Sequence, residues 1–573
     1  MKKKTFLKAI AMIMSLVTLA SASLLAGCGT EVIEKVDETK TTLKVFNYDA
    51  GFGSSWIENI KKEFEEAYKD VSFADGKKGV QVMLQLDRAA DIDQLLESGN
   101  HIIFHDIKKL LTYSANGQLV DISEAVTSVN TDGKTIESKM TEGQKSYLSQ
   151  FGGKYYAIPH YESINGLSYD VELFDEYNLY FGHGAENSDS DGFILSPTSE
   201  KSCGPDGKVG TYDDGLPATH DEIKKLFDKM LNSSTKITPM IWSGTSREEY
   251  VSQFLSHTYK ALAGDSVIYG ETLNSNGKEI KLIESFDSEG NPVITSSTIT
   301  PETGYKLSMD ANKYYTYELL DWILGDGNGK YYVSDVCEGS YSMTEAQKYY
   351  VYSAPEGSPV GIFMDGSWWY NEAEAALKAC AEEYPSYAQR KFAPFPMPRH
   401  VHGTNADVEA LGLDTEAYTV LNGQPGYAIA CAKTVTDDET YKAVIEFLKF
   451  CFTDEKLAQF TSDVYTTRAL KYEMSDEQLE KLPYYVQALW NYKKLAMENG
   501  KYHSGGYAGD WYKMNYGEVS IAGGYLWNSK VGASSYNSPM NPFLTTITAK
   551  QYYLGSLISK ATWEQTNASL LSK

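Results

Sequence analysis

The first part of the chain alternates short apolar runs with stretches of helical period. Apolar residues form a run over 43–48, recur at positions 56, 60, 64 and 67, and alternate with polar residues over 80–86. These patterns predict a strand, an amphipathic helix and a second strand. A helix, a strand and a helix are predicted next, over 91–98, 101–105 and 106–116. A β-α-β-α-β order predicts a mostly parallel sheet, with ligands bound at the carboxyl ends of its strands.

Three further helices are predicted from their start signals. A Ser or Thr followed three residues later by Glu or Gln opens an apolar period at Thr219, Thr436 and Ser475. This spacing is that of the capping box, in which the two side chains satisfy the free amides of the first turn. The helix that follows Ser475 is expected to contain Leu489. Residues 181–217 are rich in Gly, Ser, Asp and Asn, which predicts a loop insertion.

The start of the chain predicts export and lipid attachment. Four lysines in the first eight residues precede an apolar stretch over 9–26, as in a signal peptide. Leu25, Ala26, Gly27 and Cys28 match a bacterial lipobox, in which the thiol takes up a diacylglycerol before cleavage. We expect residues 1–27 to be removed and Cys28 to carry the lipid. A plain secretory peptide and an uncleaved membrane anchor are the alternatives.

Residues 28–41 are polar and lack apolar periodicity, which predicts a flexible tether. No later segment approaches the roughly 18 consecutive apolar residues that a membrane-spanning helix needs. The expected location is therefore the outer face of the cytoplasmic membrane, with the lipid as the only membrane contact. About 530 residues follow the tether, which is too many for one hydrophobic core and predicts at least two domains.

Charge and cysteine content exclude several classes of function. Loss of the four signal lysines takes the formal net charge from −25 to −29, a balance that repels nucleic acid. Acidity also serves solubility, so the charge identifies no partner. Besides Cys28 there are five cysteines at wide spacings, without a C-x-x-C pair or a Cys/His cluster. No zinc site and no disulfide framework are predicted.

Three segments resemble the extracellular solute-binding protein family 1, the maltose-binding-protein-like carbohydrate receptors of ABC transporters. They are 153–174, which begins GKYYAIP; 361–373, GIFMDGSWWYNEA; and 422–430, NGQPGYAIA. They occur in the family's order, and the resemblance extends over residues 42 to 470. It implies an α/β, type II periplasmic-binding-protein-like fold, in which two lobes joined by a hinge enclose the ligand in a cleft.

The implied lobe one comprises 42–160 and 393–458, and lobe two comprises 161–392 and 459–573. The resemblance also implies the function. The protein would be a monomer without catalysis or cofactor that captures an oligosaccharide and delivers it to ABC permease subunits. Residues 471–573 and the insertion at 181–217 exceed what compact family members contain, which leaves the size and rim of the cleft open.

A sugar offers an apolar C–H face and a rim of hydroxyls, so its site needs flat aromatic rings together with carboxylates or amides. Trp368 occupies the Gly-x-Trp position that carries a sugar-stacking tryptophan in the relatives. Trp369 is the second candidate, and core packing is the alternative for either residue. Adjacent residues at a helix start face different directions, so we expect one to bind and the other to pack.

The remaining ligand candidates follow predicted strands or lie in a late loop. The resemblance places Tyr161, Glu162 and Ser163 where relatives direct polar groups at the ligand. Glu162 could accept two sugar hydroxyls, or pair with an Arg or Lys across the hinge. Asp49 and Phe52 lie in the glycine-containing turn that ends the first strand, where backbone amides can also hold a polar ligand. Trp511, in a Gly- and Tyr-rich loop, is a candidate for the far wall.

A separate acidic loop is a candidate for structural calcium. Asp206, Asp213 and Asp214 are interspersed with glycines over 204–215. Calcium prefers six to eight oxygen ligands on a tightly turned loop. The spacing is not that of an EF-hand, since no Glu closes it. A loop whose Asp and Gly residues form turns without metal is the alternative.

Two other classes compete with the importer component. A secreted glycoside hydrolase would need two carboxyl groups about 5 to 10 Å apart. The sequence contains no eightfold β/α recurrence, no Gly-x-Ser-x-Gly and no His-Glu-x-x-His. A surface lipoprotein that binds glycan or peptide without a transporter would share the expected fold, and the sequence does not separate it from a receptor.

Overall fold

The computed structural model describes residues 35–49, 51–107, 109–264, 275–325, 329–410, 422–498 and 527–572, and the side chains among them except those of 162–165, 422–425 and 569–570. Cys28, the signal peptide and Trp511 lie outside the described residues. Residues 35–41, the described part of the predicted tether, are bound to the sheet instead of being free. The amide of Asp37 donates to Gln81 Oε1 at 2.8 Å, and Gln81 Nε2 donates to the carbonyl of Lys35 at 2.9 Å.

An eight-stranded sheet runs through the molecule in the order β2-β1-β3-β10-β4-β8-β5, with β9 paired to β4. Neighbours β1, β2 and β3 are parallel, as are β5 and β8, whereas β10 is antiparallel to both β3 and β4. The strands are β1 (Thr41–Tyr48), β2 (Val80–Asp87), β3 (Ile102–Asp106), β4 (Ala157–Asp170), β5 (Thr238–Ile241), β8 (Val360–Gly366), β9 (Phe392–Phe395) and β10 (Asn422–Ala430).

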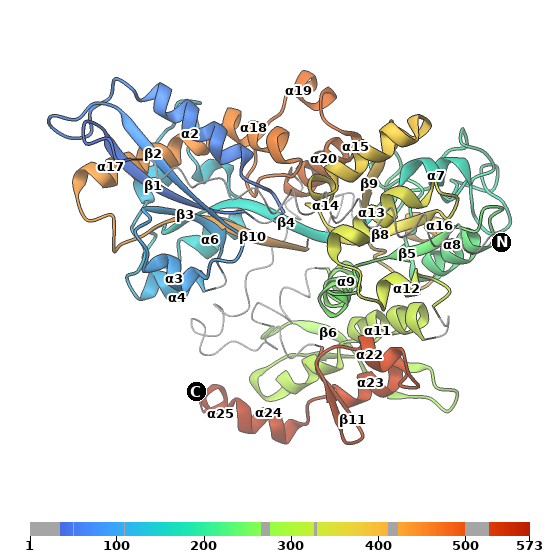
Figure 1. Cartoon of the computed structure of the whole chain (residues 1–573). Coiled ribbons are helices and arrows are strands. Elements are labelled where there is room, and N and C mark those ends of the chain that lie inside the picture. The colour runs from blue at the N-terminus through green and yellow to red at the C-terminus, as the bar shows by residue number, and fades with distance from the viewer. Residues whose placement is uncertain are drawn as a thin grey trace, which may run out of the picture.

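Strand β4 links two halves of the molecule. Its residues 157–165 pair with β10, and its residues 165–170 pair with β8 and β9. Figure 1 shows the first half, with β1, β2 and β3, on the left, and the second half, with β5, β8 and β9, on the right. The predicted fold class, two α/β lobes joined by a crossing strand, is confirmed. The residue boundaries predicted for the lobes stay predictions.

Helices cover both faces of the sheet in the first half (Figure 1). Helix α2 packs with Trp56, Ile60 and Phe64 buried, which are positions that the helical period predicts. One face of the sheet is covered by α2 (Ser55–Ala67), α17 (Asp438–Cys451) and α18 (Asp454–Val464). The other face is covered by α3 (Ile92–Leu96), α4 (Leu110–Ala115) and α6 (Glu142–Leu148). Short α5 (Ser123–Thr127) and η1 (Glu137–Lys139) connect α4 to α6.

The helices of the second half lie around β5, β8 and β9 (Figure 1). They are α7 (Val171–Glu176), α8 (His220–Asn232), α9 (Arg247–Ala263), α12 (Ser334–Cys337), α13 (Met343–Ser353), α14 (Trp369–Glu372), α15 (Glu374–Glu383), η4 (Pro385–Tyr387), α16 (Asn405–Ala410) and α20 (Tyr484–Glu498). Aromatic contacts dominate the core of this half, with Tyr350, Phe363, Trp369 and Phe392 packed against one another.

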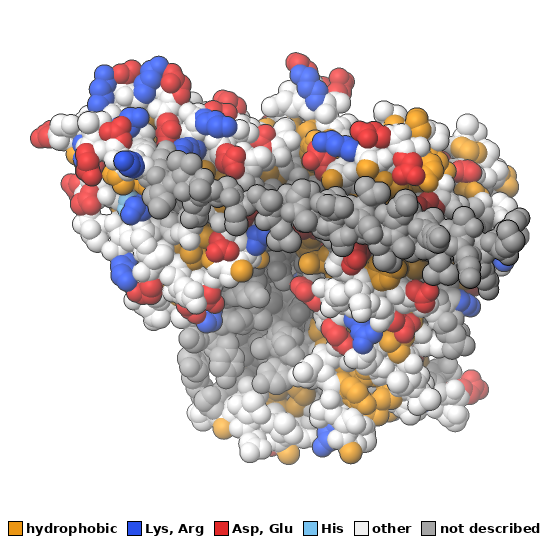
Figure 2. Space-filling model, in the orientation of Figure 1, with side chains coloured by type: hydrophobic (Ala, Val, Ile, Leu, Met, Phe, Trp, Pro, Cys, Tyr) orange, Lys and Arg blue, Asp and Glu red, His pale blue; other side chains and the backbone are white. Residues whose placement is uncertain are grey.

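A lower unit, formed by 279–324 and 527–572, lies beneath the second half (Figure 1). It has a small core of its own, made of Ile280, Leu282, Ile299, Leu307 and Trp563. Its elements are β6 (Glu279–Phe286), β7 (Pro292–Thr298), η3 (Pro301–Met309), α11 (Ala311–Leu324), β11 (Ser529–Val531), β12 (Ser534–Tyr536), α22 (Met540–Phe543), α23 (Ala549–Gly555), α24 (Lys560–Thr566) and α25 (Ala568–Leu571). Figure 2 shows acidic and basic side chains interspersed over this face of the molecule.

The predicted helix starts hold at two of three places. Thr219 accepts the amide of Glu222, and Ser475 forms a full capping box with Gln478. The prediction at Thr436 was wrong by one residue, because the carboxylate of Asp437 caps α17. The helix that begins after Ser475, α19 (Asp476–Glu480), is short, and Leu489 lies in the separate helix α20.

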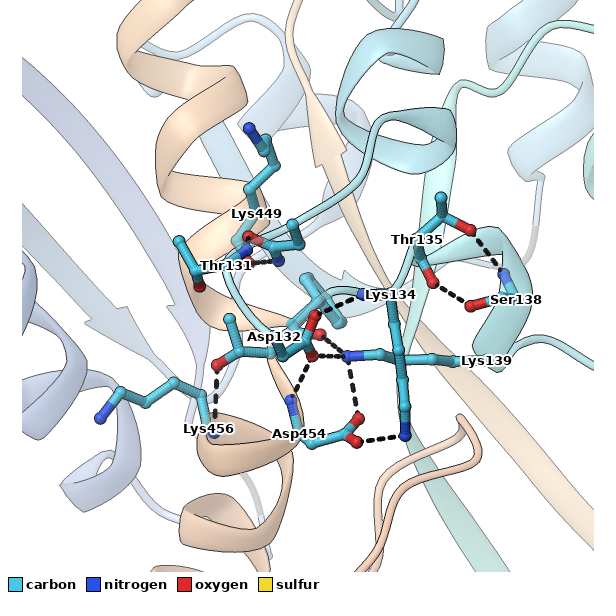
Figure 3. Close-up of polar contacts among 12 residues, drawn as sticks. Thr131, Asp132, Lys134, Thr135, Ser138, Lys139, Lys449, Asp454 and Lys456 are labelled. Atoms are coloured by element: carbon cyan, nitrogen blue, oxygen red, sulfur yellow. Dashed lines mark hydrogen bonds and ion pairs between the residues drawn. The ribbon is translucent and has the colours of Figure 1, made fainter.

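A buried ion-pair network attaches the start of α18 to the 132–139 segment of the first half (Figure 3). Lys139 is 2% exposed, and its Nζ lies 2.5 Å from Asp132 Oδ2 and 2.9 Å from Asp454 Oδ1. The same Nζ donates to the carbonyl of Phe452 at 2.7 Å. Lys134 pairs with the other oxygen of Asp454 at 2.6 Å from a more exposed position. One buried ammonium thus joins the 132–139 segment to the start of α18.

The five cysteines that the structure describes are all free and buried. None of the helices in the described part of the chain has the length and apolar character needed to cross a membrane.

Candidate ligand-binding site

Strands of both halves end where the halves meet. Strand β1 ends at Tyr48 and leads through a tight turn into α2, and β8 ends at Gly366 and leads into α14. Gly51 adopts a φ of +69° in the first turn, and a Cβ there would lie 3.2 Å from Cβ of Trp368. Asn371 Nδ2 donates to the carbonyl of Gly51 at 2.8 Å. The two turns therefore touch directly across the halves.

An aromatic cluster lies at this junction. Phe52 packs on Tyr161 with ring centroids 4.3 Å apart, and meets Trp368 edge-on at 6.5 Å. Phe52 and Tyr161 are buried, whereas Trp368 remains partly exposed. The indole ring lies over Gly366, where a Cβ would come within 2.0 Å of ring carbons. Glycine at 366 is thus a steric requirement for this position of the ring.

Polar groups flank the aromatic cluster. Asp49 lies 3.8 Å from Nε of Arg88, which follows β2 directly. Burial raises the pKa of Asp49, and the charge of Arg88 opposes that rise. Burial likewise raises the pKa of Glu372 in α14, while Gln347 and Arg88 act in the opposite direction. Arg88 of the first half therefore acts electrostatically on a carboxylate of each half.

Asp365 is the most deeply buried carboxyl group of this region. Its Oδ1 accepts the hydroxyl of Tyr250 at 2.9 Å, and its Oδ2 accepts Gln347 Nε2 at 3.1 Å. The same Gln347 nitrogen donates to Glu372 Oε2 at 2.7 Å. Burial raises the pKa of Asp365 to about 7, against the hydrogen bonds that favour its ionised form. Helices α9 and α13 thus hold two carboxyl groups in fixed orientation beside Trp368.

Three of the predicted ligand residues come together, and a fourth lies beside them. Phe52, Tyr161 and Trp368 form the cluster, and the hydroxyl of Tyr161 donates to Asp106 at the end of β3. Asp49 lies in the turn before Phe52 and is partly exposed. Whether these residues bind a ligand stays a prediction.

Of the other four predicted residues, the structure describes the side chain of Trp369 alone. Glu162 and Ser163 belong to β4 and pair in register with Pro425 and Gln424, while their side chains lie outside the described part. Trp511, as stated, is likewise not described. Trp369 is wholly buried, and its indole nitrogen donates to Ser168 at 3.1 Å. Of the adjacent pair, Trp369 is thus the one whose side chain packs in the core.

Sequence reasoning missed several polar residues of this region. Arg88 could have been found, because it follows a correctly predicted strand just as Asp49 does. Asp365 stands in the segment that carried the family resemblance, directly before the Gly-x-Trp turn. Tyr250 and Gln347 lie in helices, and no local pattern distinguishes them from ordinary helical residues.

The arrangement suits recognition of an uncharged polar molecule. Flat rings offer apolar faces, while carboxylates, an amide and a guanidinium offer directed hydrogen bonds. The carboxylates already have donors within the protein, since Tyr161, Tyr250, Gln347 and Arg88 serve them. Hydrogen bonding of these carboxylates therefore does not depend on a cationic ligand.

The chain was compared with known proteins. No family model matches it, and no curated protein matches it. Its structure is similar to that of a chitin oligosaccharide binding protein, with 16% identity over 82% of this chain and 90% of that one, at a TM-score of 0.46.

Two further similarities have TM-scores of 0.49. One is to RafE from Streptococcus pneumoniae, at 13% identity over 94% of this chain and 100% of that one. The other is to a cyclic alpha-maltosyl-1,6-maltose binding protein from Arthrobacter globiformis, at 11% identity over 93% and 100%. The first and the third of these proteins are named as binding proteins.

Proposed function

We propose that this protein binds an oligosaccharide between its two halves and releases it chemically unchanged. The observation that carries the proposal is the junction itself. Phe52 and Tyr161 of the first half and Trp368 of the second form one aromatic cluster, with the polar groups of Asp49, Arg88 and Glu372 beside it. A sugar that stacks on Trp368 would have hydroxyl partners on both sides.

The charge of the region favours an uncharged ligand. Asp49, Asp106, Asp365 and Glu372 are gathered near the junction, with Arg88 as the cation that contacts Asp49. Their combined field opposes a carboxylated or phosphorylated ligand. A neutral sugar escapes this repulsion, and the partly exposed carboxylates of Asp49 and Glu372 can accept its hydroxyl protons.

We further propose that the protein is the lipid-anchored substrate-binding component of an ABC importer, outside the cytoplasmic membrane. The lipobox that ends at Cys28 supports the anchor. A two-lobed receptor can signal its loaded state by closing about a hinge, and strand β4 supplies the crossing connection that such a motion needs. The permease would then distinguish loaded from empty receptor by shape.

A thermal-shift screen against mono- and oligosaccharides tests the binding proposal, since a ligand that binds only the folded state raises the melting temperature. With a sugar that raises it, Trp368→Ala should weaken binding by about 5- to 150-fold, the equivalent of about 1 to 3 kcal/mol for a lost aromatic contact. Trp322→Ala is the matched control, because Trp322 is also partly exposed but packs on Tyr331 with centroids 4.1 Å apart.

Equal sugar affinity of the Trp368→Ala and Trp322→Ala variants would remove Trp368 from the site. Hydrolysis of the bound sugar by the wild-type protein would contradict the proposal more broadly, because it would assign the carboxyl groups to catalysis.

A further inference from the structure

The acidic loop before α8 holds two carboxyl groups in an unusual setting. Asp206 and Asp213 each have 0% of their surface exposed, and Asp214 beside them is partly exposed. The loop belongs to the second half and precedes α8, at the right of Figure 1 and away from the junction with the first half. It is thus separate from the proposed sugar site.

Backbone donors serve most of the carboxylate oxygens of this loop. Asp213 Oδ2 accepts the amide of Asp206 at 3.0 Å, and its Oδ1 accepts the hydroxyl of Thr211 at 2.8 Å. Asp206 Oδ1 accepts the amide of Lys208 at 2.8 Å. Asp206 Oδ2, by contrast, is buried and has no hydrogen-bond partner. An oxygen with that charge and no partner is costly to bury.

Among the described residues no cation forms an ion pair with either carboxyl group, that of Asp206 or that of Asp213, although the charge of Lys208 acts to lower the pKa of Asp206. Lys201 lies over the ring of Tyr180 at 3.2 Å and pairs with Asp175 at 3.7 Å. Burial raises the pKa of Asp213 well above its usual range, and the neighbouring charge of Asp206 raises it further. A cation from outside the chain would stabilise two ionised carboxylates here.

We propose that Asp206 and Asp213 bind a calcium ion, with Asp206 Oδ2 as one ligand and main-chain carbonyls and water completing the shell. Calcium accepts six to eight oxygens and uses carbonyls readily. Within the described residues no three His, Cys, Asp or Glu side chains converge into a metal cage, so carbonyls must supply part of the shell.

The ligand atoms that the described residues of this loop provide for a metal ion are oxygens. Cys203 is adjacent in sequence, but its Sγ contacts Asn405 and burial raises its pKa to about 12, so it stays a thiol. A thiol that keeps its proton is a poor ligand for zinc, because the thiolate is the form that binds the metal. The hard, oxygen-binding calcium ion fits this donor set better.

The proposed ion would brace the insertion against the second half. Tyr212, within the loop, packs on Tyr492 of α20 with ring centroids 4.7 Å apart. Gly204 adopts a φ of +62°, and a Cβ there would lie 2.1 Å from the carbonyl oxygen of Asp213, so the two ends of the loop are in contact. An ion between Asp206 and Asp213 would fix this closure and the position of Tyr212.

The test compares melting temperatures in EGTA and in millimolar calcium, with magnesium as the parallel ion. For the wild-type protein we expect calcium to raise the melting temperature by about 2 °C or more, and magnesium to do markedly less. Asp206→Asn should abolish the calcium shift. In EGTA this variant should melt no lower than the wild type, because it removes one of two facing charges.

Asp189→Asn is the matched control. Asp189 lies in the same insertion and caps a turn by accepting the amides of Asp191 and Phe193, but it is exposed and pairs with Lys229. This variant should keep the full calcium shift. Terbium offers a second readout, since Tyr212 can sensitise its emission, and calcium should displace it from the wild-type protein but not change the signal of Asp206→Asn.

Three results would overturn the proposal. They are a wild-type melting temperature that does not respond to calcium, an equal shift with magnesium, and a calcium shift that survives in Asp206→Asn. The first result, together with a melting temperature that falls as pH rises from acid to neutral, would identify a proton shared by the two carboxyl groups instead of a metal.

Discussion

The network around Lys139 gives a sharp prediction about stability. Lys139→Met keeps the length of the side chain but removes its charge, and Asp132 and Asp454 lose their buried partner (Figure 3). Removing one member of a buried ion pair costs about 3 to 5 kcal/mol, because the remaining charge is left uncompensated. Lys134→Met is the control, since Lys134 contacts the same Asp454 from a side chain that is 48% exposed. Exposed pairs of this kind contribute about 0 to 1 kcal/mol.

Calorimetric unfolding measures the difference. For a folding unit of this size, about 3 to 5 kcal/mol corresponds to a fall of about 6 °C or more in the transition of the first half. Lys134→Met should shift it by about 4 °C at most. Equal shifts in the two variants would contradict the prediction. Burial of the lysine would then not determine how much its ion pairs contribute to the free energy of unfolding.

The network also sets a pH dependence. Burial acts to raise the pKa of Asp132, but hydrogen bonds from Lys139 and from the amide of Asp454 outweigh it and hold the pKa below its usual value. A carboxyl whose folded pKa is lowered contributes stability above its unfolded pKa of about 4, and that stability is lost as the pH falls below it. Lys139→Met should therefore flatten the acid limb of the stability curve of the first half.

Four other changes test the remaining parts of the account. Trp369→Ala should lower stability by about 3 to 5 kcal/mol in thermal unfolding, as for other buried aromatic residues, and a loss below 1 kcal/mol would contradict its core position. Asp365 has a folded pKa of about 7, so stability should fall as the pH rises from about 4 to about 7, and Asp365→Asn should flatten this slope in pH-dependent melting. Asn371→Ala loses the hydrogen bond to Gly51 across the halves and should weaken sugar binding by about 2- to 12-fold in calorimetry, whereas unchanged affinity would separate that contact from closure. Cys28→Ser should release the protein from the membrane fraction, and retention there would contradict the lipid anchor.

Local sequence patterns predicted the first half well, because its strands and helices have clear apolar periods in the sequence. The strands at 43–48 and 80–86 and the helix with Trp56, Ile60 and Phe64 lie where the apolar positions place them. Capping was less certain, since both Thr436 and Asp437 can accept a first-turn amide. The structure selects Asp437, which also lies next to the helix start. Pro483 lies between α19 and α20, and the capping pattern at Ser475 does not indicate this break between the two helices.

The candidate site was partly predictable for the same reason. Phe52, Tyr161 and Trp368 follow strand ends or turns that the sequence marks, so their approach could be expected from a shared sheet edge. The choice between Trp368 and Trp369 depended on backbone direction at the start of α14, which adjacent residues do not reveal. Tyr250 and Gln347 reach Asp365 only because α9 and α13 pack against β8, and such tertiary contacts leave no local signal.

The proposal that the protein binds an oligosaccharide and leaves it chemically unchanged can be tested by titration calorimetry. The wild-type protein is titrated with an oligosaccharide that raises its melting temperature. We expect saturable binding of one sugar per chain, and we expect the same sugar to be recovered intact from the calorimeter cell afterwards. Absence of binding heat for every oligosaccharide of a broad panel, or recovery of cleaved products, would contradict it.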